Sequence, residues 1–202
     1  MPTVVVRHDL PIAEGLEGTR PDLTVRDAGS TADAIAALPD GDAFVCNPSN
    51  WDDEFLDGLA PGNWVQATST GYAAFPIDAF EKQGVAFTNA RGNYGPPVAD
   101  HAFALALALV RNLPTYLENQ RDRRWDRSVG EGLGDLGGRT LTVAGLGDIG
   151  ETIARRGRGF GMEVQGTKRD PDAYEGHLPA ERVHPAGALD DLLPRTDLLV
   201  LS

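Results

Sequence analysis

The sequence predicts an α/β protein with two doubly wound parallel-sheet domains, and three observations support this prediction. Short runs of β-branched and apolar residues alternate with helical patterns from the start of the chain. The alternation pauses in a polar and glycine-rich stretch over residues 118–138 and then resumes. A glycine-rich turn directly follows the first strand after that pause. Because strands that alternate with helices pair in parallel, each half is expected to form its own layered sheet.

The first half contains short apolar runs that are predicted to form strands, separated by helical patterns. The strands are expected over residues 3–6, 23–25, 43–46, 64–67 and 85–88. The helices are expected over residues 31–37, 53–59 and 76–83. Ser30 and Asp52 precede two of these helices, where a side chain commonly caps the first turn. Residues 1–95 are therefore predicted to form the first domain.

A long buried helix is predicted over residues 98–110, although its leucines and Phe103 alternate with alanines as in a strand. Alanine and leucine are strong helix formers, and the run has no β-branched residue in its interior. The loop 91–97 precedes it. An arginine-rich stretch over 118–127 and a glycine-rich stretch over 130–138 follow, and they are expected to connect the domains.

The second half repeats the strand and helix pattern and, with the long linking helix, is assigned to residues 96–202. Strands are expected over residues 140–144, 163–166 and 198–201, and helices over residues 148–160 and 188–193. A sheet of this kind normally continues beyond its third strand. We therefore expect residues 96–202 to be only the N-terminal part of a larger domain, and the chain to be truncated.

The charge of the chain is strongly acidic, with 30 acidic residues against 18 basic ones and a formal net charge of −12. Such a surface repels phosphate backbones and anionic lipids, so neither nucleic acid nor membrane is an expected partner. Only Lys82 and Lys168 are lysines, and this scarcity together with the acidic excess predicts a salt-adapted, halophilic protein. In molar salt a Debye length of about 3 Å would screen the acidic self-repulsion.

The single cysteine and the chain start give simpler expectations. Cys46 has no partner for an intrachain disulfide and ends an apolar run, so we expect a buried, inert thiol. The N-terminus lacks a cationic region before a long apolar stretch, and no apolar run reaches transmembrane length. We expect a cytoplasmic protein, and we expect no metal site.

A glycine-rich turn stands between a predicted strand and a predicted helix. The residues are Gly145-Leu146-Gly147-Asp148-Ile149-Gly150, directly after the strand 140–144. In this context Gly145 would make the tight turn, Gly147 would admit a pyrophosphate close to the backbone, and Gly150 would let helix and strand pack. Amides at the helix start, including those of Asp148 and Ile149, would hold the diphosphate. The pattern predicts a dinucleotide site.

The end of the next predicted strand indicates which dinucleotide is preferred. An acidic residue there would accept hydrogen bonds from the NAD ribose, but the strand leads to Lys168 and Arg169, eighteen positions after Gly150. Two cations suit a 2′-phosphate, so NADP(H) is the expected cofactor. Asp170 follows and could bind a ribose, so NAD(H) stays possible. The alternative is that Lys168 and Arg169 form a solvated strand end that binds no phosphate.

The order of these parts resembles the D-isomer-specific 2-hydroxyacid dehydrogenase family. Four segments carry the resemblance: residues 64–72, residues 84–92, Val98-Ala99-Asp100-His101 and the turn at Gly145. The resemblance implies a flavodoxin-like substrate domain, a Rossmann dinucleotide domain and, at full length, a homodimer. It also implies hydride transfer between a nicotinamide and C2 of a small 2-keto or 2-hydroxy acid.

The resemblance also assigns roles to residues of this chain. Thr70 and Gly71 match a loop whose backbone amides hold the substrate carboxylate, and Val98 matches a contact to the nicotinamide. His101, on the long helix, is expected to be a packing or interface residue. Asn47, Ser49 and Trp51 follow the third strand at the edge where such sheets bind ligands, so they are expected to line the substrate pocket.

The catalytic groups of the family have no match in this chain. In the family an arginine orients the keto acid, and a histidine assisted by a glutamate supplies the proton. The chemistry needs a cation for the carboxylate and a group that titrates near neutrality beside the carbonyl. All three residues are expected beyond Ser202. His8, His177 and His184 match no motif that could replace them. We therefore predict an inactive fragment of an NADP(H)-preferring 2-keto-acid reductase. The alternative is a dinucleotide-sensing, corepressor-like protein on the same fold.

Overall fold

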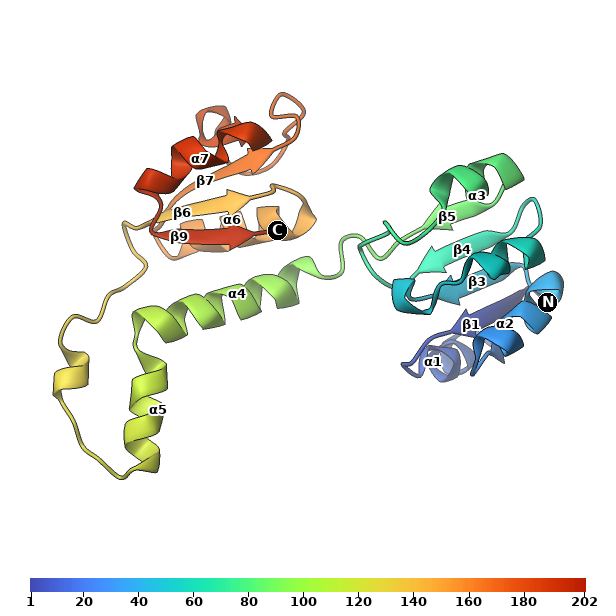
Figure 1. The fold of residues 1–202 in the computed structure, drawn as a ribbon, viewed down its shortest axis with the longest axis horizontal. Coiled ribbons are helices and arrows are strands. Elements are labelled where there is room, and N and C mark those ends of the chain that lie inside the picture. Colours follow the sequence, from blue (N-terminus) through green and yellow to red (C-terminus); the bar gives the residue numbers. More distant parts are fainter. The chain divides into compact units, whose positions relative to one another are not determined.

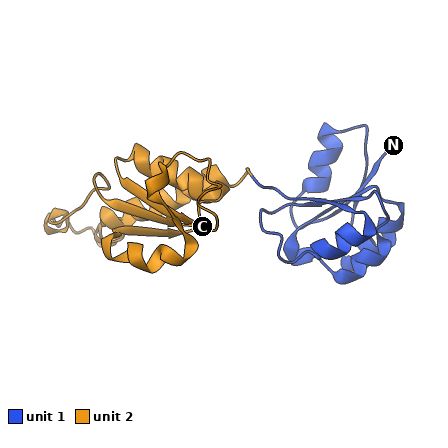
Figure 2. Cartoon of the chain, turned by 90° about the horizontal axis from the view of Figure 1, so that it is seen from above, with its two compact units in different colours: residues 1–91 blue, residues 92–202 orange.

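The computed structural model describes all residues from Met1 to Ser202 and divides them into two compact units, Met1–Arg91 and Gly92–Ser202 (Figure 2). The boundary lies inside the loop predicted over residues 91–97. The stretch over residues 118–138 lies within the second unit, so the expectation that it connects the domains is wrong. Part of this stretch forms a helix, which the polar sequence did not reveal.

The first unit contains a five-stranded parallel sheet with the order β2-β1-β3-β4-β5 (Figure 1). Its strands are β1 (Thr3–Arg7), β2 (Thr24–Asp27), β3 (Ala43–Cys46), β4 (Trp64–Ala67) and β5 (Ala86–Thr88). All five were predicted, and two have the predicted ends. The central strands are buried on both faces, which favours the apolar and β-branched runs seen in the sequence.

The helices of the first unit are α1 (Ile12–Thr19), α2 (Thr31–Ala37) and α3 (Ile77–Gln83). Ser30 caps α2 as predicted, since its side chain accepts a hydrogen bond from the Asp33 amide at 3.2 Å. The helix α1 was not predicted, because Gly15 and Gly18 lie in it and no side chain caps it. The α-helix predicted over residues 53–59 is instead a 3₁₀ helix, Asp53–Gly58.

Aromatic side chains form the core on one face of the first sheet. Phe44 and Phe55 are fully buried and meet edge to face, with ring centroids 5.1 Å apart. Trp51 joins this cluster, with its ring 5.3 Å from that of Phe80. The opposite face is covered by α1 and carries small aliphatic residues such as Val4 and Val6.

The second unit contains a four-stranded parallel sheet with the order β8-β7-β6-β9 (Figure 1). Its strands are β6 (Thr140–Ala144), β7 (Glu163–Lys168), β8 (Val183–Pro185) and β9 (Leu198–Leu201). Three of them were predicted. The strand β8 was missed because it has three residues, lies at the sheet edge and ends on a proline.

The helices of the second unit are α4 (Gly95–Val110), α5 (Leu113–Arg121), α6 (Asp148–Gly159) and α7 (Leu189–Leu192). The predicted long helix is confirmed as α4, but it begins three residues earlier because prolines fit the first helical positions. It packs against α6, and Phe103 stacks on Phe160 with ring centroids 4.9 Å apart. Among all the helices, none combines the length and apolar character that a bilayer crossing requires.

Candidate functional site

The glycine-rich turn links β6 to α6 and is tied to the neighbouring strand β7. Gly145 follows β6 with φ +106°, a backbone conformation that side chains disfavour. The Gly145 amide donates to the Thr167 hydroxyl at 3.3 Å, and the Leu146 amide donates to the Thr167 carbonyl at 2.8 Å. These bonds fix the point at which α6 begins, with Gly147 as its N-cap.

The three glycines of the turn have different steric roles. A Cβ at Gly150 would overlap the carbonyl oxygen of Gly145, and a Cβ at Gly145 would overlap the carbonyl oxygen of Ser202. These two glycines are therefore required by the packing of the protein itself. A Cβ at Gly147 would meet no atom within 4 Å. Open space therefore lies beside the helix start, as close approach of a ligand requires.

The first amides of α6 have no acceptor within the protein. The Glu151 amide donates to the Gly147 carbonyl at 2.8 Å, but no bond satisfies the amides of Asp148 and Ile149. Unpaired amides and the positive end of the helix dipole favour an anion at this position. One carboxylate oxygen of Asp148 is buried without a partner at the same helix start. The residues present thus fit the diphosphate of a dinucleotide, although Asp148 and Glu151 in the first turn of α6 carry opposing charges.

The two predicted cations at the end of β7 differ in their surroundings. Lys168 is half-buried, and its ammonium donates to the Leu146 carbonyl at 3.1 Å. The same ammonium lies 5.6 Å above the centre of the Tyr174 ring, within range of a cation–π interaction. Arg169 is exposed to solvent. Lys168 therefore also braces the glycine-rich turn, whereas Arg169 is directed to solvent.

The loop after β7 is anchored to the start of α6 by Glu151. Its carboxylate accepts hydrogen bonds from the Tyr174 hydroxyl, from the His177 amide at 2.7 Å and from the His177 ring at 2.8 Å. Burial, followed by the hydrogen bond to Glu151, raises the pKa of Tyr174. Sequence reasoning missed these residues; the only available sign was a glutamate directly after Gly150.

At the carboxyl edge of the first sheet, three polar side chains lie together. His8, Asn47 and Thr68 each directly follow the last residue of their strands, β1, β3 and β4. The His8 Nε2 atom lies 2.9 Å from the Thr68 hydroxyl, and the Asn47 amide nitrogen lies 3.4 Å from the same hydroxyl. Asn47 was predicted as a site residue, but His8 and Thr68 were not. Their shared position after adjacent strands was the missed signal.

The other predicted substrate residues occupy different surroundings. Ser49 donates hydrogen bonds to the Asn47 side chain from its amide at 3.0 Å and its hydroxyl at 2.9 Å. The Thr70 hydroxyl is buried without a partner. The backbone carbonyl of Thr70 accepts a hydrogen bond from the Asn89 side chain at 2.7 Å. Gly71 is exposed. Trp51 lies apart from this group, because its ring packs into the aromatic core.

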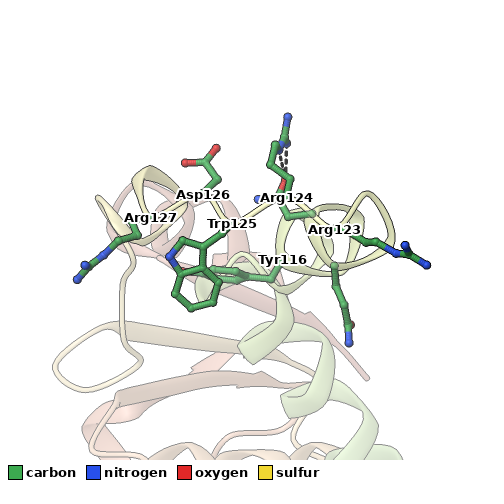
Figure 3. A pocket seen from close by; sticks show the side chains of 8 residues that line it. Tyr116, Arg123, Arg124, Trp125, Asp126 and Arg127 are labelled. Carbon is green, nitrogen blue, oxygen red and sulfur yellow. Dashed lines mark hydrogen bonds between the residues drawn. The ribbon is translucent and has the colours of Figure 1, made fainter.

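The remaining candidate residues lie in the second unit. Val98 is in the first turn of α4 and is exposed, as is His101. A cavity of about 520 Å³ lies between α5 and the segment that follows it (Figure 3). Its lining combines Tyr116 and Trp125 with three arginines, Arg123, Arg124 and Arg127. The Trp125 side chain is 91% exposed. This cavity is formed by α5 and its loop, not by the glycine-rich turn.

Comparisons with known proteins agree with this geometry. Residues 103–202 match the model of the D-isomer specific 2-hydroxyacid dehydrogenase family, NAD binding domain. The chain is 32% identical over 170 residues to D-3-phosphoglycerate dehydrogenase of Mycobacterium tuberculosis, covering 82% of this chain and 31% of that protein. It is 30% identical over 174 residues to glyoxylate/hydroxypyruvate reductase B of Yersinia pestis, covering 83% of this chain and 52% of that protein.

Solved structures share the fold of the whole chain. A D-isomer specific 2-hydroxyacid dehydrogenase family protein from Aeromonas salmonicida superposes with a TM-score of 0.77 at 27% identity, covering 99% of this chain and 63% of that one. D-Lactate dehydrogenase from Aquifex aeolicus, in complex with NAD and lactic acid, superposes with a TM-score of 0.78 at 22% identity. The match covers 98% of this chain and 60% of that one.

The parallel sheets and the glycine-rich turn define a protein of the NAD-binding, Rossmann-fold class. Within that class, the chain belongs to the D-isomer specific 2-hydroxyacid dehydrogenase family. The predicted family and fold class are therefore confirmed. The chain spans about a third to a half of the length of the curated relatives described above.

Proposed function

We propose that the protein takes part in the NADP(H)-preferring reduction of 2-keto acids to D-2-hydroxy acids in the cytoplasm. The observation that carries the proposal is the Lys168-Arg169 pair at the end of β7, beside a turn with open space at Gly147. A 2′-phosphate attached to the adenosine ribose would meet two cations there, where NAD-specific sites hold an acidic residue.

In this proposal residues 96–202 bind the dinucleotide and residues 1–95 bind the keto acid. The amides at Gly147, Asp148 and Ile149 hold the diphosphate, and Val98 contacts the nicotinamide. The loop at Thr70 and Gly71 binds the substrate carboxylate through its backbone, with Asn47 and Ser49 nearby. The bound dinucleotide supplies the hydride that adds to C2 of the keto acid.

The test is a comparison of NADPH and NADH binding by fluorescence titration. The double variant Lys168→Met/Arg169→Gln should weaken NADPH binding at least tenfold more than it weakens NADH binding, a difference of about 1.4 kcal/mol. Arg155→Gln, an exposed substitution on α6, serves as the matched control for lost positive charge. An equal loss for both dinucleotides would refute the preference, and no binding of either would refute the site.

We also propose a homodimer formed through α4 and α5. Leu109, Leu113 and Leu117 are 73%, 46% and 53% exposed, and Trp125, after α5, is 91% exposed. Exposed apolar residues that gather on neighbouring helices are typical of protein interfaces. Sedimentation should show a dimer that Leu109→Asp dissociates and Arg155→Gln leaves intact; a monomeric unsubstituted chain would contradict the proposal.

Salt adaptation completes the proposal, since the net charge is −12. Screening of the acidic surface should stabilise the fold as salt is added. Thermal unfolding should move to higher temperature between 0.1 and 2 M potassium chloride. A transition temperature that is independent of salt would contradict a halophilic origin.

A further inference from the structure

The polar side chains at the carboxyl edge of the first sheet converge on one point. The strands β1, β3 and β4 are adjacent, and the register aligns Arg7 with Cys46 and Cys46 with Ala67. The next residue of each strand is therefore brought to the same edge, namely His8, Asn47 and Thr68. In open parallel sheets this edge is where ligands bind. The placement follows from the strand register and not from local sequence.

The hydrogen bonds fix which way His8 and Asn47 present their donors. The His8 Nδ1 atom accepts from the Leu10 amide at 2.8 Å, so the neutral ring carries its proton on Nε2. The Asn47 carbonyl oxygen accepts from Ser49, which turns the Asn47 amide nitrogen toward His8 and Thr68. Two N–H donors from different strands thus point to the same place.

The Asn47 contacts leave room for a better acceptor. Its amide nitrogen lies 3.4 Å from the Thr68 hydroxyl, which is long for a hydrogen bond, and 3.5 Å from the His8 Nε2 atom, which is itself a donor in this tautomer and cannot accept. His8 and Asn47 are half-buried, so both retain contact with solvent. A ligand oxygen placed between them would give the Asn47 amide a shorter bond and would take the His8 donor in place of the Thr68 hydroxyl, which now lies 2.9 Å from Nε2. A donor pair of this kind recognises an oxygen substituent and gains nothing from an alkyl group.

We infer that His8 and Asn47 bind an oxygen substituent of the substrate beyond C2. The inference rests on the proposed 2-keto-acid function. Thr68 is two residues before Thr70, in the loop proposed to hold the substrate carboxylate. The donor pair is therefore a specificity element for 2-keto acids that carry a hydroxyl group at C3. His8 and Asn47 select the substrate and do not transfer its proton.

The experiment is an NMR titration of the chain in the presence of NADPH with two keto acids that differ by one oxygen, hydroxypyruvate and pyruvate. The Gly71 amide reports binding at the carboxylate loop, and the His8 ring nitrogens report contact with the C3 group. We expect hydroxypyruvate to bind at least fivefold more tightly than pyruvate. The His8 resonances should shift with hydroxypyruvate only.

Three variants separate recognition from folding. His8→Leu should reduce the hydroxypyruvate preference to less than twofold and leave pyruvate binding within twofold. His8→Gln, which restores a donor, should recover most of the preference, and Asn47→Ala should lower it independently. His101→Leu, at an exposed position of α4, is the matched control and should change neither ligand.

The outcomes distinguish this inference from the function on which it rests. Equal binding of both keto acids, with shifts at Gly71 but none at His8, would overturn the donor pair and leave the proposed function intact. No shift at Gly71 with either keto acid would overturn both. A preference unchanged in folded His8→Leu and Asn47→Ala would also overturn the inference.

Discussion

Each unit joins its first two strands through a helix, β1-α1-β2 in the first and β6-α6-β7 in the second, yet the turn after the first strand is built from different residues. In the second unit β6 passes into α6 through Gly145 and Gly147, and the helix starts three residues after Gly145. In the first unit β1 passes into α1 through His8, Asp9, Leu10 and Pro11. The turn between β6 and α6 leaves unpaired backbone amides beside open space, whereas the turn between β1 and α1 places the His8 side chain at the sheet edge.

The difference shows that topology locates a ligand edge and that the turn residues decide its chemistry. Backbone amides at a helix start attract a diphosphate, and the absence of a Cβ at Gly147 lets the anion approach them closely. An imidazole and an amide side chain suit a smaller group with one or two acceptor oxygens. The same sheet design therefore provides a dinucleotide edge in one unit and a keto-acid edge in the other, according to the functions proposed above.

The largest effect is expected for Gly150→Ala, which tests the tight packing of the second turn. The added Cβ would overlap the Gly145 carbonyl oxygen, which belongs to backbone and cannot move aside. We expect a loss of about 3 kcal/mol in the free energy of unfolding, together with loss of NADPH binding. Chemical denaturation measures the free energy of unfolding. Gly159→Ala, with open space around its Cβ, should be nearly neutral.

Gly147→Ala separates binding from stability at the same turn. Its Cβ would meet no protein atom, and its φ of −88° is accessible to alanine, so unfolding should be unchanged. The methyl group would occupy the space assigned to the diphosphate, and NADPH should bind at least tenfold more weakly, a loss of about 1.4 kcal/mol. Unchanged affinity in a titration would show that the diphosphate binds elsewhere.

Gly15→Ala makes the corresponding change in the first unit and should have the opposite sign. Gly15 lies inside α1 and has open space around its Cβ. Alanine should stabilise this helix by about 0.5–1 kcal/mol, because glycine is a poor helix former. Urea denaturation would detect the gain. A loss of stability would mean that α1 requires glycine at this position and would contradict the prediction.

The smallest effect concerns pH and Tyr174. Because the folded pKa of Tyr174 is raised, its stabilising contribution is complete below the unfolded value and is lost as pH rises through the folded one. Stability should therefore decline above about pH 10, the ordinary tyrosine value. Tyr174→Phe should weaken this decline. Denaturation at pH 8 and at pH 11 gives the comparison, and identical slopes for both proteins would exclude the tyrosine as the cause.

The sequence predicted most of the fold because local signals and the fold agree. The strands Ala43–Cys46 and Thr140–Ala144 are short apolar runs between turn residues, and both form as expected. The helix α1 escaped prediction because its glycines are poor helix formers that only packing overrides. The helix α5 was hidden by polar composition, and β8 by its length.

The candidate sites were predictable only where the signal is local. The glycine-rich turn is contiguous in sequence, so its strand, turn and helix could be assigned in advance. The contact of His8 with Thr68 joins residues sixty positions apart and depends on strand order and register. The contact of Glu151 with Tyr174 depends on the path of a loop. Neither arrangement has a periodicity that a single sequence displays.

The bond from Lys168 to the Leu146 carbonyl has a consequence for how coenzyme preference can change in evolution. A substitution at Lys168 removes a cation and also a brace of the turn, so it alters affinity for every dinucleotide at once. A substitution at exposed Arg169 alters only the charge near the ribose. A gradual path from NADP to NAD would therefore begin at residue 169 and reach residue 168 only after another contact had secured the turn.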